Sequence, residues 1–413
     1  MSSKKTSTDE SSLRVSLQDI QKAREVLKGV IKPTDLDRSV SASKLFGSEV
    51  FYKFENTQYT GSFKLRGAYN KIFNLTADEK KRGVVASSAG NHAQGVAYSA
   101  TKLGVRSKIV MPIHAPLVKV SATREYGAEV VFHGEVVDDS HIHAHELEQS
   151  EGLVFVHPYQ DALVIAGQGT LGLEIIEALP DLDSVIVPIG GGGLISGIAT
   201  AIKAINPKCR VIGVQSQQAP GMELLFNHKD GGTVPARIST IADGIAIKRP
   251  SAKMYETFIS RLVDEVVTVT DDEIAEAIVF CLEKAKTVLE GAGAAGVAAL
   301  MNRRLNLGRR TCVLLCGGNI DLNIISKVIE KGQIRKGRLV ELSVIVDDLP
   351  GNLSRLTQII ASERANIMEV HHDRVSEGLY LRETKIDFVL ETTSPDHVQK
   401  IRAALIKSGA RIQ

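Results

Sequence analysis

The sequence has no tryptophan, few aromatic residues and only four cysteines among its 413 residues. The cysteines are Cys209, Cys281, Cys312 and Cys316, and they lack the paired spacing of a zinc site or a disulfide framework. No run approaches the ~18 apolar residues that span a bilayer, and the Ser-, Lys- and Thr-rich start has no apolar stretch of signal-peptide length. We therefore predict a cytoplasmic protein without a membrane partner, whose residues 1–15 form a disordered leader.

Neither sign of charge is in large excess. The formal net charge is only +2, which is too small a field to recruit nucleic acid or an anionic membrane, so a small molecule is the expected partner. Hydrophobic residues make up 43% of the chain, which is enough for sizeable cores, and the length suits two or three domains.

Short apolar runs alternate with helix-like segments along most of the chain. These runs fall at residues 84–85, 107–112, 128–132, 184–188, 211–214 and 312–316. Continuous apolar strands separated by helices predict an α/β fold with parallel sheets covered on both faces. Ligands of such sheets bind beyond the carboxyl ends of the strands.

Lys64 lies where a strand-like segment gives way to a helical one. Most lysines are solvated surface charges, but this one has an apolar neighbour, Phe63, and two glycines, Gly61 and Gly67, that allow the backbone to approach a ligand closely. An amine held near such a pocket is easily desolvated toward its neutral, nucleophilic form. The pattern makes Lys64 a candidate for a covalent bond to a carbonyl compound.

Four consecutive glycines follow the apolar run at residues 184–188. They remove every side chain from the turn before a predicted helix, so backbone N–H groups can converge on a phosphate at the positive end of that helix. A flexible turn would have the same composition. No P-loop Lys-Ser/Thr follows the glycines, and the spacing is not that of a dinucleotide fingerprint. A phosphate site together with a reactive lysine points to pyridoxal phosphate.

Two further polar loops follow predicted strands. The first contains Ser88, Ala89, Gly90, Asn91 and His92, and its amides and hydroxyl suit a substrate carboxylate, although an ordinary helix cap would have a similar sequence. The second is a glycine turn after Cys316. This thiol could meet a ring nitrogen, or it could be only a small buried hydrophobe.

Residues 16 to about 325 resemble the threonine/serine dehydratase family of fold-type II pyridoxal phosphate enzymes. The resemblance rests on four blocks in family order, Gly-Ser-Phe-Lys-x-Arg-Gly-Ala, Ser-Ala-Gly-Asn-His-Ala-Gln-Gly, Gly-Gly-Gly-Gly-Leu and Gly-Gly-Asn. It implies a two-domain core similar to the tryptophan synthase β subunit. The large cofactor-binding domain would comprise residues 16–53 and 153–330, and the small mobile domain residues 54–152.

The same resemblance implies residue roles. Lys64 would form the Schiff base and act as the catalytic base. The cofactor would be bound by Phe63, Lys64, Asn91, Gly190, Gly191, Gly192, Gly193, Leu194, Gly244, Glu290 and Cys316. The substrate would be bound by Ser88, Ala89, Gly90, Asn91 and His92.

The implied reaction is β-elimination from L-threonine or L-serine, which gives a 2-oxo acid and ammonia. Serine racemases, which resemble this chain closely, usually carry a hydroxyl residue at the position of Ala89, and alanine cannot move a proton. The alternatives are a racemase, a hydroxyaspartate dehydratase and, from another class, a catalytically silent amino-acid sensor.

Metal binding is not predicted. His141 and His145 would share a helical face, but their acidic neighbours favour a solvated surface. The acidic residues that hold a divalent ion in racemase-like relatives are not evident at residues 215–220. A monovalent ion held by carbonyl groups stays open.

The tail from Arg338 onward reads as a separate unit. Alternating and helical apolar spacings predict a βαββαβ ferredoxin-like fold for residues 338–413, joined to the core by a basic stretch at residues 331–337. The tail resembles the ACT domain, a regulatory module that binds small amino acids, although RNA-binding and metal-carrying domains share this fold. By resemblance the effector would contact Asp348, Leu349, Gly351, Asn352 and Leu353.

The resemblance also implies a homo-oligomer, a dimer or a tetramer. The presence of a single ACT-like unit favours a role in threonine catabolism over one in isoleucine biosynthesis. Neither the effector nor the preference between threonine and serine follows from the sequence.

Overall fold

The computed structural model describes residues 13–228, 238–302, 305, 307–375 and 378–413. The chain divides into two compact units, Met1–Asp321 and Leu322–Gln413. Among the described residues, no helix is both long and apolar enough to cross a membrane.

The first unit contains a six-stranded sheet in the order β1-β2-β10-β7-β8-β9, parallel except for β1. Its strands are β1 (Leu36–Arg38), β2 (Glu49–Lys53), β7 (Ser184–Pro188), β8 (Arg210–Ser216), β9 (Glu265–Val269) and β10 (Arg310–Leu314). β7 is buried along its whole length, as expected for a central strand covered on both faces.

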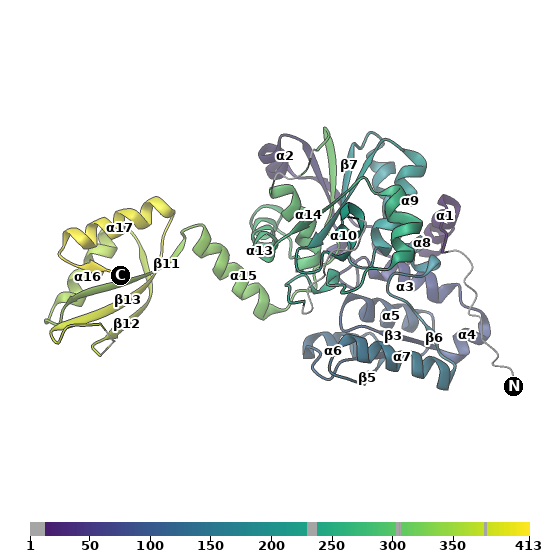
Figure 1. The fold of residues 1–413 in the computed structure, drawn as a ribbon, viewed down its shortest axis with the longest axis horizontal. Helices are drawn as coiled ribbons and strands as arrows, with labels where there is room; N and C mark the ends of the chain where they lie inside the picture. Colours follow the sequence, from purple (N-terminus) through teal and green to yellow (C-terminus); the bar gives the residue numbers. More distant parts are fainter. Residues whose placement is uncertain (1–12, 229–237, 303–304, 306, 376–377) are drawn as a thin grey trace. The chain divides into compact units, whose positions relative to one another are not determined.

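Helices cover both faces of this sheet, with α8 and α9 on one side and α13 and α14 on the other (Figure 1). The helices of this layer are α1 (Leu17–Leu27), α2 (Val40–Phe46), α3 (Lys64–Phe73), α8 (Ala162–Ala178), α9 (Gly193–Ile205), α10 (Gly221–His228), α11 (Ala252–Met254), α12 (Ser260–Leu262), α13 (Asp271–Phe280) and α14 (Gly291–Met301). Short 3₁₀ turns lie at Glu55–Thr57 and Asp243–Ile245, and π-helical turns at Tyr255–Ile259 and Cys281–Ala285.

A second, four-stranded parallel sheet has the order β5-β4-β3-β6. It comprises β3 (Val84–Ser87), β4 (Ser107–Met111), β5 (Glu129–Phe132) and β6 (Val154–Phe155), with α4 (Ala77–Arg82), α5 (Asn91–Lys102), α6 (Leu117–Glu125) and α7 (Val137–Glu151). Strand alternation places Val84 in the core beneath α5 and Val85 in the core beneath α7. This sheet runs from residue 84 to residue 155, whereas the predicted small domain covers residues 54–152, and that domain boundary stays a prediction.

The N-terminal segment departs from the expected leader. Residues 1–12 lie outside the described residues, but Leu13 is buried in a core cluster with Ile165, so the prediction of disorder up to residue 15 is wrong for its last residues. Helix α1 then begins with a capping box, in which Ser16 Oγ accepts from the Asp19 N–H at 3.3 Å.

The second unit has an antiparallel sheet in the order β12-β13-β11-β14. Its elements are α15 (Leu322–Arg335), β11 (Leu339–Asp347), α16 (Asn352–Ser362), β12 (Asn366–Asp373), β13 (Glu383–Glu391), α17 (Pro395–Lys407) and β14 (Arg411–Ile412). From β11 onward this is the predicted βαββαβ ferredoxin-like fold. The stretch at residues 331–337, expected to join the core to the tail, is largely helical, because α15 continues through Arg335.

Candidate active site

Lys64 is the first residue of α3, which begins directly after a turn anchored to the end of β10. Ser62 forms an isolated antiparallel bridge with Gly317, and the Phe63 N–H donates to the Cys316 carbonyl at 3.2 Å. Gly61 has a φ of +68°, and a Cβ atom there would lie 2.3 Å from Asn319 Oδ1. The glycine is therefore required both by the backbone conformation and by the close approach of Asn319.

Lys64 as a whole residue is half-buried, and its amine is buried. Its Nζ donates to the Pro158 carbonyl at 2.9 Å and lies 5.3 Å from the centre of the Phe63 ring. Burial lowers the pKa of Lys64 to about 8, although Cys316 and Glu290 pull it upward. A far larger fraction of this amine is thus neutral near pH 7 than for a surface lysine.

Asn91 lies at the start of α5 and connects the two sheets of this unit. Its Nδ2 donates to Glu290 Oε1 at 2.6 Å, and its Oδ1 accepts from Asn319 Nδ2 at 2.7 Å. Burial, with a contribution from Asp243, raises the pKa of Glu290 to about 7, and the Asn91 amide opposes that rise. The structure therefore brings Asn91, Glu290 and Lys64 into one site.

Cys316 lies two residues after the end of β10 and is buried. Its Sγ is 3.6 Å from the Ala292 carbonyl, and burial raises the pKa of the thiol, so it stays protonated. The thiol interacts electrostatically with both Lys64 and Glu290. Cys316 thus faces this site as a neutral group.

The glycine loop connects β7 to α9, as predicted. Gly192 has a φ of +95°, and no side chain among the described residues caps the helix that begins at Gly193. Leu194 lies in the first turn of that helix. The N-terminal N–H groups of this 13-residue helix therefore follow directly on a loop that has no side chains to cover them. They lie at the carboxyl edge of the sheet.

The 3₁₀ turn that contains Gly244 borders this loop. A Cβ atom on Gly190 would lie 3.2 Å from the Gly244 carbonyl oxygen, and one on Gly244 would lie 3.8 Å from Glu290 Oε1. Gly244 therefore lies between the glycine loop and the Asn91–Glu290 pair.

The loop at residues 88–91 leaves the end of β3 and enters α5. Ser88 Oγ accepts from the Gly90 N–H at 3.2 Å, and Ala89 packs on the core beneath α5. His92 is different, because its Nε2 donates to the Val156 carbonyl at 2.7 Å and burial lowers its pKa to about 3. The His92 side chain is therefore neutral and engaged elsewhere.

Three residues of the site were missed by the sequence analysis. Asn319 joins Asn91 to the Thr60 carbonyl at 2.8 Å, and it was visible as the last residue of the Gly-Gly-Asn block. Pro158 accepts from Lys64, and Tyr159 packs against the glycine loop. The last two come from a loop whose proximity to Lys64 exists only in the folded chain.

Comparison with known proteins defines the family. Residues 27–317 match the family model described as pyridoxal-phosphate dependent enzyme. The chain belongs to this family. It is 46% identical to the L-threonine ammonia-lyase of Thermotoga maritima over 399 residues, which cover 97% of this chain and 99% of that protein.

Solved structures give the same result. The processed form of threonine deaminase isoform 2 from Solanum lycopersicum superposes with a TM-score of 0.72 at 35% identity, covering 77% of this chain and 87% of that one. Maize serine racemase superposes with a TM-score of 0.72 at 31% identity, covering 78% of this chain and 98% of that one. The predicted α/β fold-type II core is confirmed.

The site has the groups that the cofactor of this family requires. Lys64 supplies a desolvated amine, and the uncapped start of α9 behind Gly192 supplies N–H donors for a phosphate. The hydroxyl of Ser62, two residues before Lys64, is buried without a hydrogen-bond partner among the described residues. A polar group of a bound cofactor could supply that missing hydrogen bond. The residues present therefore fit pyridoxal phosphate.

The histidine-rich helix α7 packs partly into the fold. No group of three or more His, Cys, Asp or Glu residues in the described ranges could hold a metal ion. His141 and His145 do share a face of α7, with ring centres 4.8 Å apart, but His141 is half-buried and packs edge-on against Phe155. The predicted solvated face is thus wrong for His141.

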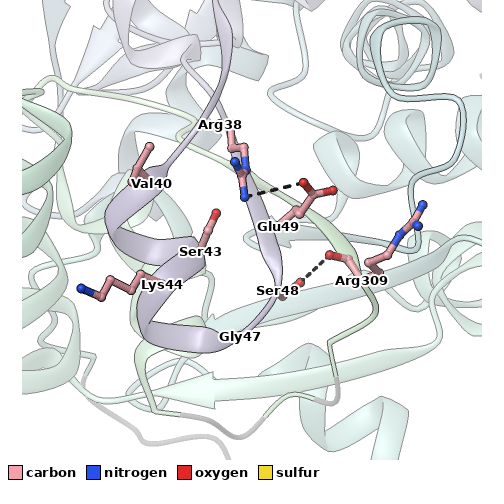
Figure 2. Close-up of a pocket in the computed structure, with 8 residues that line it drawn as sticks. All are labelled: Arg38, Val40, Ser43, Lys44, Gly47, Ser48, Glu49 and Arg309. Atoms are coloured by element: carbon pink, nitrogen blue, oxygen red, sulfur yellow. Dashed lines mark hydrogen bonds and ion pairs between the residues drawn. The ribbon is translucent and has the colours of Figure 1, made fainter.

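The pocket in Figure 2 lies at the amino ends of strands in the six-stranded sheet, whereas Lys64 lies beyond their carboxyl ends. It is lined by Arg38, Val40, Ser43, Lys44, Gly47, Ser48, Glu49 and Arg309, near the amino ends of β2 and β10. Within it, Arg38 pairs with Glu49 at 3.6 Å, and Ser48 donates to the Arg309 carbonyl at 3.0 Å. Since Lys64 lies beyond the carboxyl ends of these strands, this pocket is separate from the candidate active site.

Proposed function

We propose that the chain is a threonine ammonia-lyase, which converts L-threonine to 2-oxobutanoate and ammonia and also accepts L-serine, giving pyruvate. The observation that carries this proposal is the match with the L-threonine ammonia-lyase of Thermotoga maritima, which extends over nearly all of both chains. The reaction needs a reactive amine and a site for the cofactor phosphate. The desolvated amine of Lys64 supplies the first, and the glycine loop before α9 supplies the second.

We also propose the cofactor-binding roles that the family resemblance implies, and the positions of the residues support them. Lys64 would hold the cofactor through its Nζ, with Phe63 beside the ring and Cys316 near the ring nitrogen. The loop of Gly190, Gly191, Gly192, Gly193 and Leu194 would hold the phosphate. Asn91, oriented by Glu290 and Asn319, has its amide group at the centre of the site, and Gly244 borders it.

The substrate carboxylate would be bound by the loop at residues 88–91. Its Ser88 hydroxyl and backbone N–H groups lie at the start of α5, where the helix dipole favours an anion. We assign the neutral side chain of His92 no contact with the substrate, because its Nε2–H is donated to Val156. Its backbone N–H stays available as part of the first turn of α5.

Bound pyridoxal phosphate supplies an electron-withdrawing ring that stabilises negative charge at the substrate Cα. The neutral Lys64 amine accepts the α-proton as general base, a role for which its pKa of about 8 is well suited. The Cys316 thiol cannot place a full positive charge on the ring nitrogen, because it is a weak and neutral donor. Loss of the β-hydroxyl is therefore favoured over return of the proton.

A serine racemase is the nearest alternative, since maize serine racemase has the same fold. Racemisation needs a second acid on the face of Cα opposite Lys64. Ala89, at the position where racemases usually carry a hydroxyl residue, packs on an apolar core and has no proton to give. Elimination needs only Lys64 and is therefore the reaction that these residues support.

The purified protein is expected to release 2-oxo acid and ammonia in equal amounts from L-threonine and from L-serine, with no accumulation of the D-isomer. Steady-state assay of 2-oxo acid together with chiral chromatography of the remaining amino acid checks this. Formation of D-serine faster than pyruvate would identify a racemase. The absence of both products, in protein loaded with the cofactor, would favour the catalytically silent sensor.

We further propose that residues 338–413 form an ACT domain that binds a small-amino-acid effector. The proposed effector residues lie together at the junction of β11 and α16, with Asp348, Leu349 and Gly351 in the turn and Asn352 and Leu353 at the start of the helix. Leu349 is 62% exposed there, and Gly351 has a φ of +92° at a helix start without a side-chain cap. An exposed turn at the N-terminus of a helix suits a carboxylate.

The effector is identified by kinetics with and without isoleucine or valine. A change in kcat or KM of more than about twofold supports regulation through this unit, and unchanged kinetics with every small amino acid would reject it. The cytoplasmic location, the homo-oligomer and the catabolic role stay predictions.

A further inference from the structure

His157 lies in the loop between β6 and α8 and organises that loop by accepting hydrogen bonds. Its Nδ1 accepts from the Gln160 N–H at 2.8 Å and from the Tyr159 N–H at 3.2 Å. Because Nδ1 is the acceptor for both, the neutral ring carries its proton on Nε2. The same ring meets the Tyr159 ring edge-on, with centres 4.6 Å apart.

The loop that His157 holds contacts both halves of the active site. The Pro158 carbonyl accepts from Lys64 Nζ at 2.9 Å. Tyr159 packs on the glycine loop so closely that a Cβ atom on Gly191 would lie 2.3 Å from its ring, and one on Gly193 would lie 2.9 Å from its Cα. One turn of backbone thus determines the place of the lysine acceptor and one wall of the phosphate loop.

We propose that His157 is a positioning residue for Lys64, which acts by accepting the Tyr159 and Gln160 N–H groups and so aiming the Pro158 carbonyl at the lysine amine. This inference rests on the proposed role of Lys64 and adds a residue that touches neither substrate nor cofactor. Nothing in the motifs around Lys64 indicates it, because His157 is 93 positions away in the sequence.

The surroundings of His157 keep it in the accepting form. The titratable groups that face it are His141 and His145 from α7, Asp161 from its own loop, Lys64 from α3 and His92 from α5. Burial and then His141 lower the pKa of His157 to about 4, while Asp161 opposes the shift. The ring is therefore neutral at every pH at which Lys64 titrates.

Two substitutions separate the hydrogen bonds from the ring. His157→Phe keeps a ring of similar shape but removes the acceptor, whereas His157→Asn removes the ring and keeps a side-chain oxygen that can accept N–H groups two and three residues ahead. In the cofactor-free full chain, we expect pH-dependent acylation of Lys64, followed by peptide mass spectrometry, to have its midpoint near pH 8. His157→Phe should lower that midpoint by about half a unit, because the Pro158 carbonyl stabilises the ammonium form more than the amine.

The variants should also differ in catalysis. In the loaded enzyme, His157→Phe is expected to lower kcat roughly tenfold with KM changed less than about threefold, and His157→Asn should restore both kcat and the acylation midpoint. His145→Asn is the matched control, because it removes a ring of the same cluster that has no bond to the loop at residues 157–160. It should change neither quantity.

The proposal is wrong if His157→Phe leaves the acylation midpoint and kcat unchanged, or if a folded His157→Asn loses as much as His157→Phe. A measurement on the unmodified holoenzyme is independent of any variant. Hydrogen exchange should show protected amides at Tyr159 and Gln160, and exchange at the rate of free peptide would overturn the proposal. Acylation and amide exchange involve no substrate, so they test His157 even if the proposed reaction is wrong.

Discussion

Replacement of Lys64 by alanine is expected to lower kcat for 2-oxo acid release by at least about 10³-fold. The reason is that one side chain provides both the covalent attachment of the cofactor and the general base, and a positioned base alone contributes roughly 10²- to 10⁴-fold. Steady-state kinetics with L-threonine, at saturating pyridoxal phosphate, measures the loss. Lys64→Arg should fail equally, because a guanidinium is always charged and cannot accept the proton.

Lys102 provides the control for this experiment. It is an exposed lysine at the end of α5, over the Tyr98 ring, and it has no contact with the site. Lys102→Ala should keep kcat within about twofold of the unmodified enzyme, as expected for an exposed surface residue. A small primary amine added to Lys64→Ala should restore part of the rate, because it can act as the missing base. Wild-type activity in Lys64→Ala would remove the basis of the whole interpretation.

Replacement of Arg66 by methionine is expected to destabilise the first unit by roughly 3–5 kcal/mol. Arg66 is fully buried and binds Glu55 at 2.7 Å and Glu174 at 2.5 Å. Burial alone would lower the pKa of Arg66, but Glu55 and Glu174 outweigh burial and raise it, so the Arg66 guanidinium is charged in the folded state. Methionine would leave Glu55 buried without its charged partner, which is the costly case.

Urea unfolding followed by circular dichroism measures this loss as a lower midpoint. Arg24→Met is the matched control, because it breaks an exposed pair with Glu177, whose side chains are 41% and 58% exposed. Such a pair contributes only about 0–1 kcal/mol. Adding Glu55→Gln to Arg66→Met should recover part of the loss. Equal midpoints for Arg66→Met and Arg24→Met would contradict the ion-cluster account.

The sequence was most informative where a local backbone pattern determines the chemistry. The glycines around Lys64 and after β7 are required by conformations that the chain adopts within a few residues, such as the φ of +95° at Gly192. The position of Cys316 beside Lys64 could be expected because the two residues follow β10 and β2, parallel neighbours in one sheet whose loops meet at the same edge. Asn91 follows β3 of the other sheet, so its place beside them depends on how the two sheets pack. The ferredoxin-like tail followed from its alternating and helical apolar spacings.

Contacts between distant segments were not predictable in this way. Arg66 was part of a sequence motif, but its burial in an ion cluster could not be predicted, because its partner Glu174 lies 108 positions later in α8. His157 depends on the loop that brings Pro158 to Lys64, and the half-burial of His141 depends on Phe155 in the next strand. The end of the leader depends on the core that receives Leu13. None of these contacts leaves a periodic pattern in the sequence.

The most direct test of the central claim is to locate the cofactor attachment in the unmodified enzyme. Borohydride reduction of the loaded full-length protein, digestion and peptide mass spectrometry should place one pyridoxyl group on Lys64 and none on Lys71, which lies in the same helix and pairs with Asp161. A stoichiometric label on any other lysine, or a fully active enzyme without a label, would contradict the account.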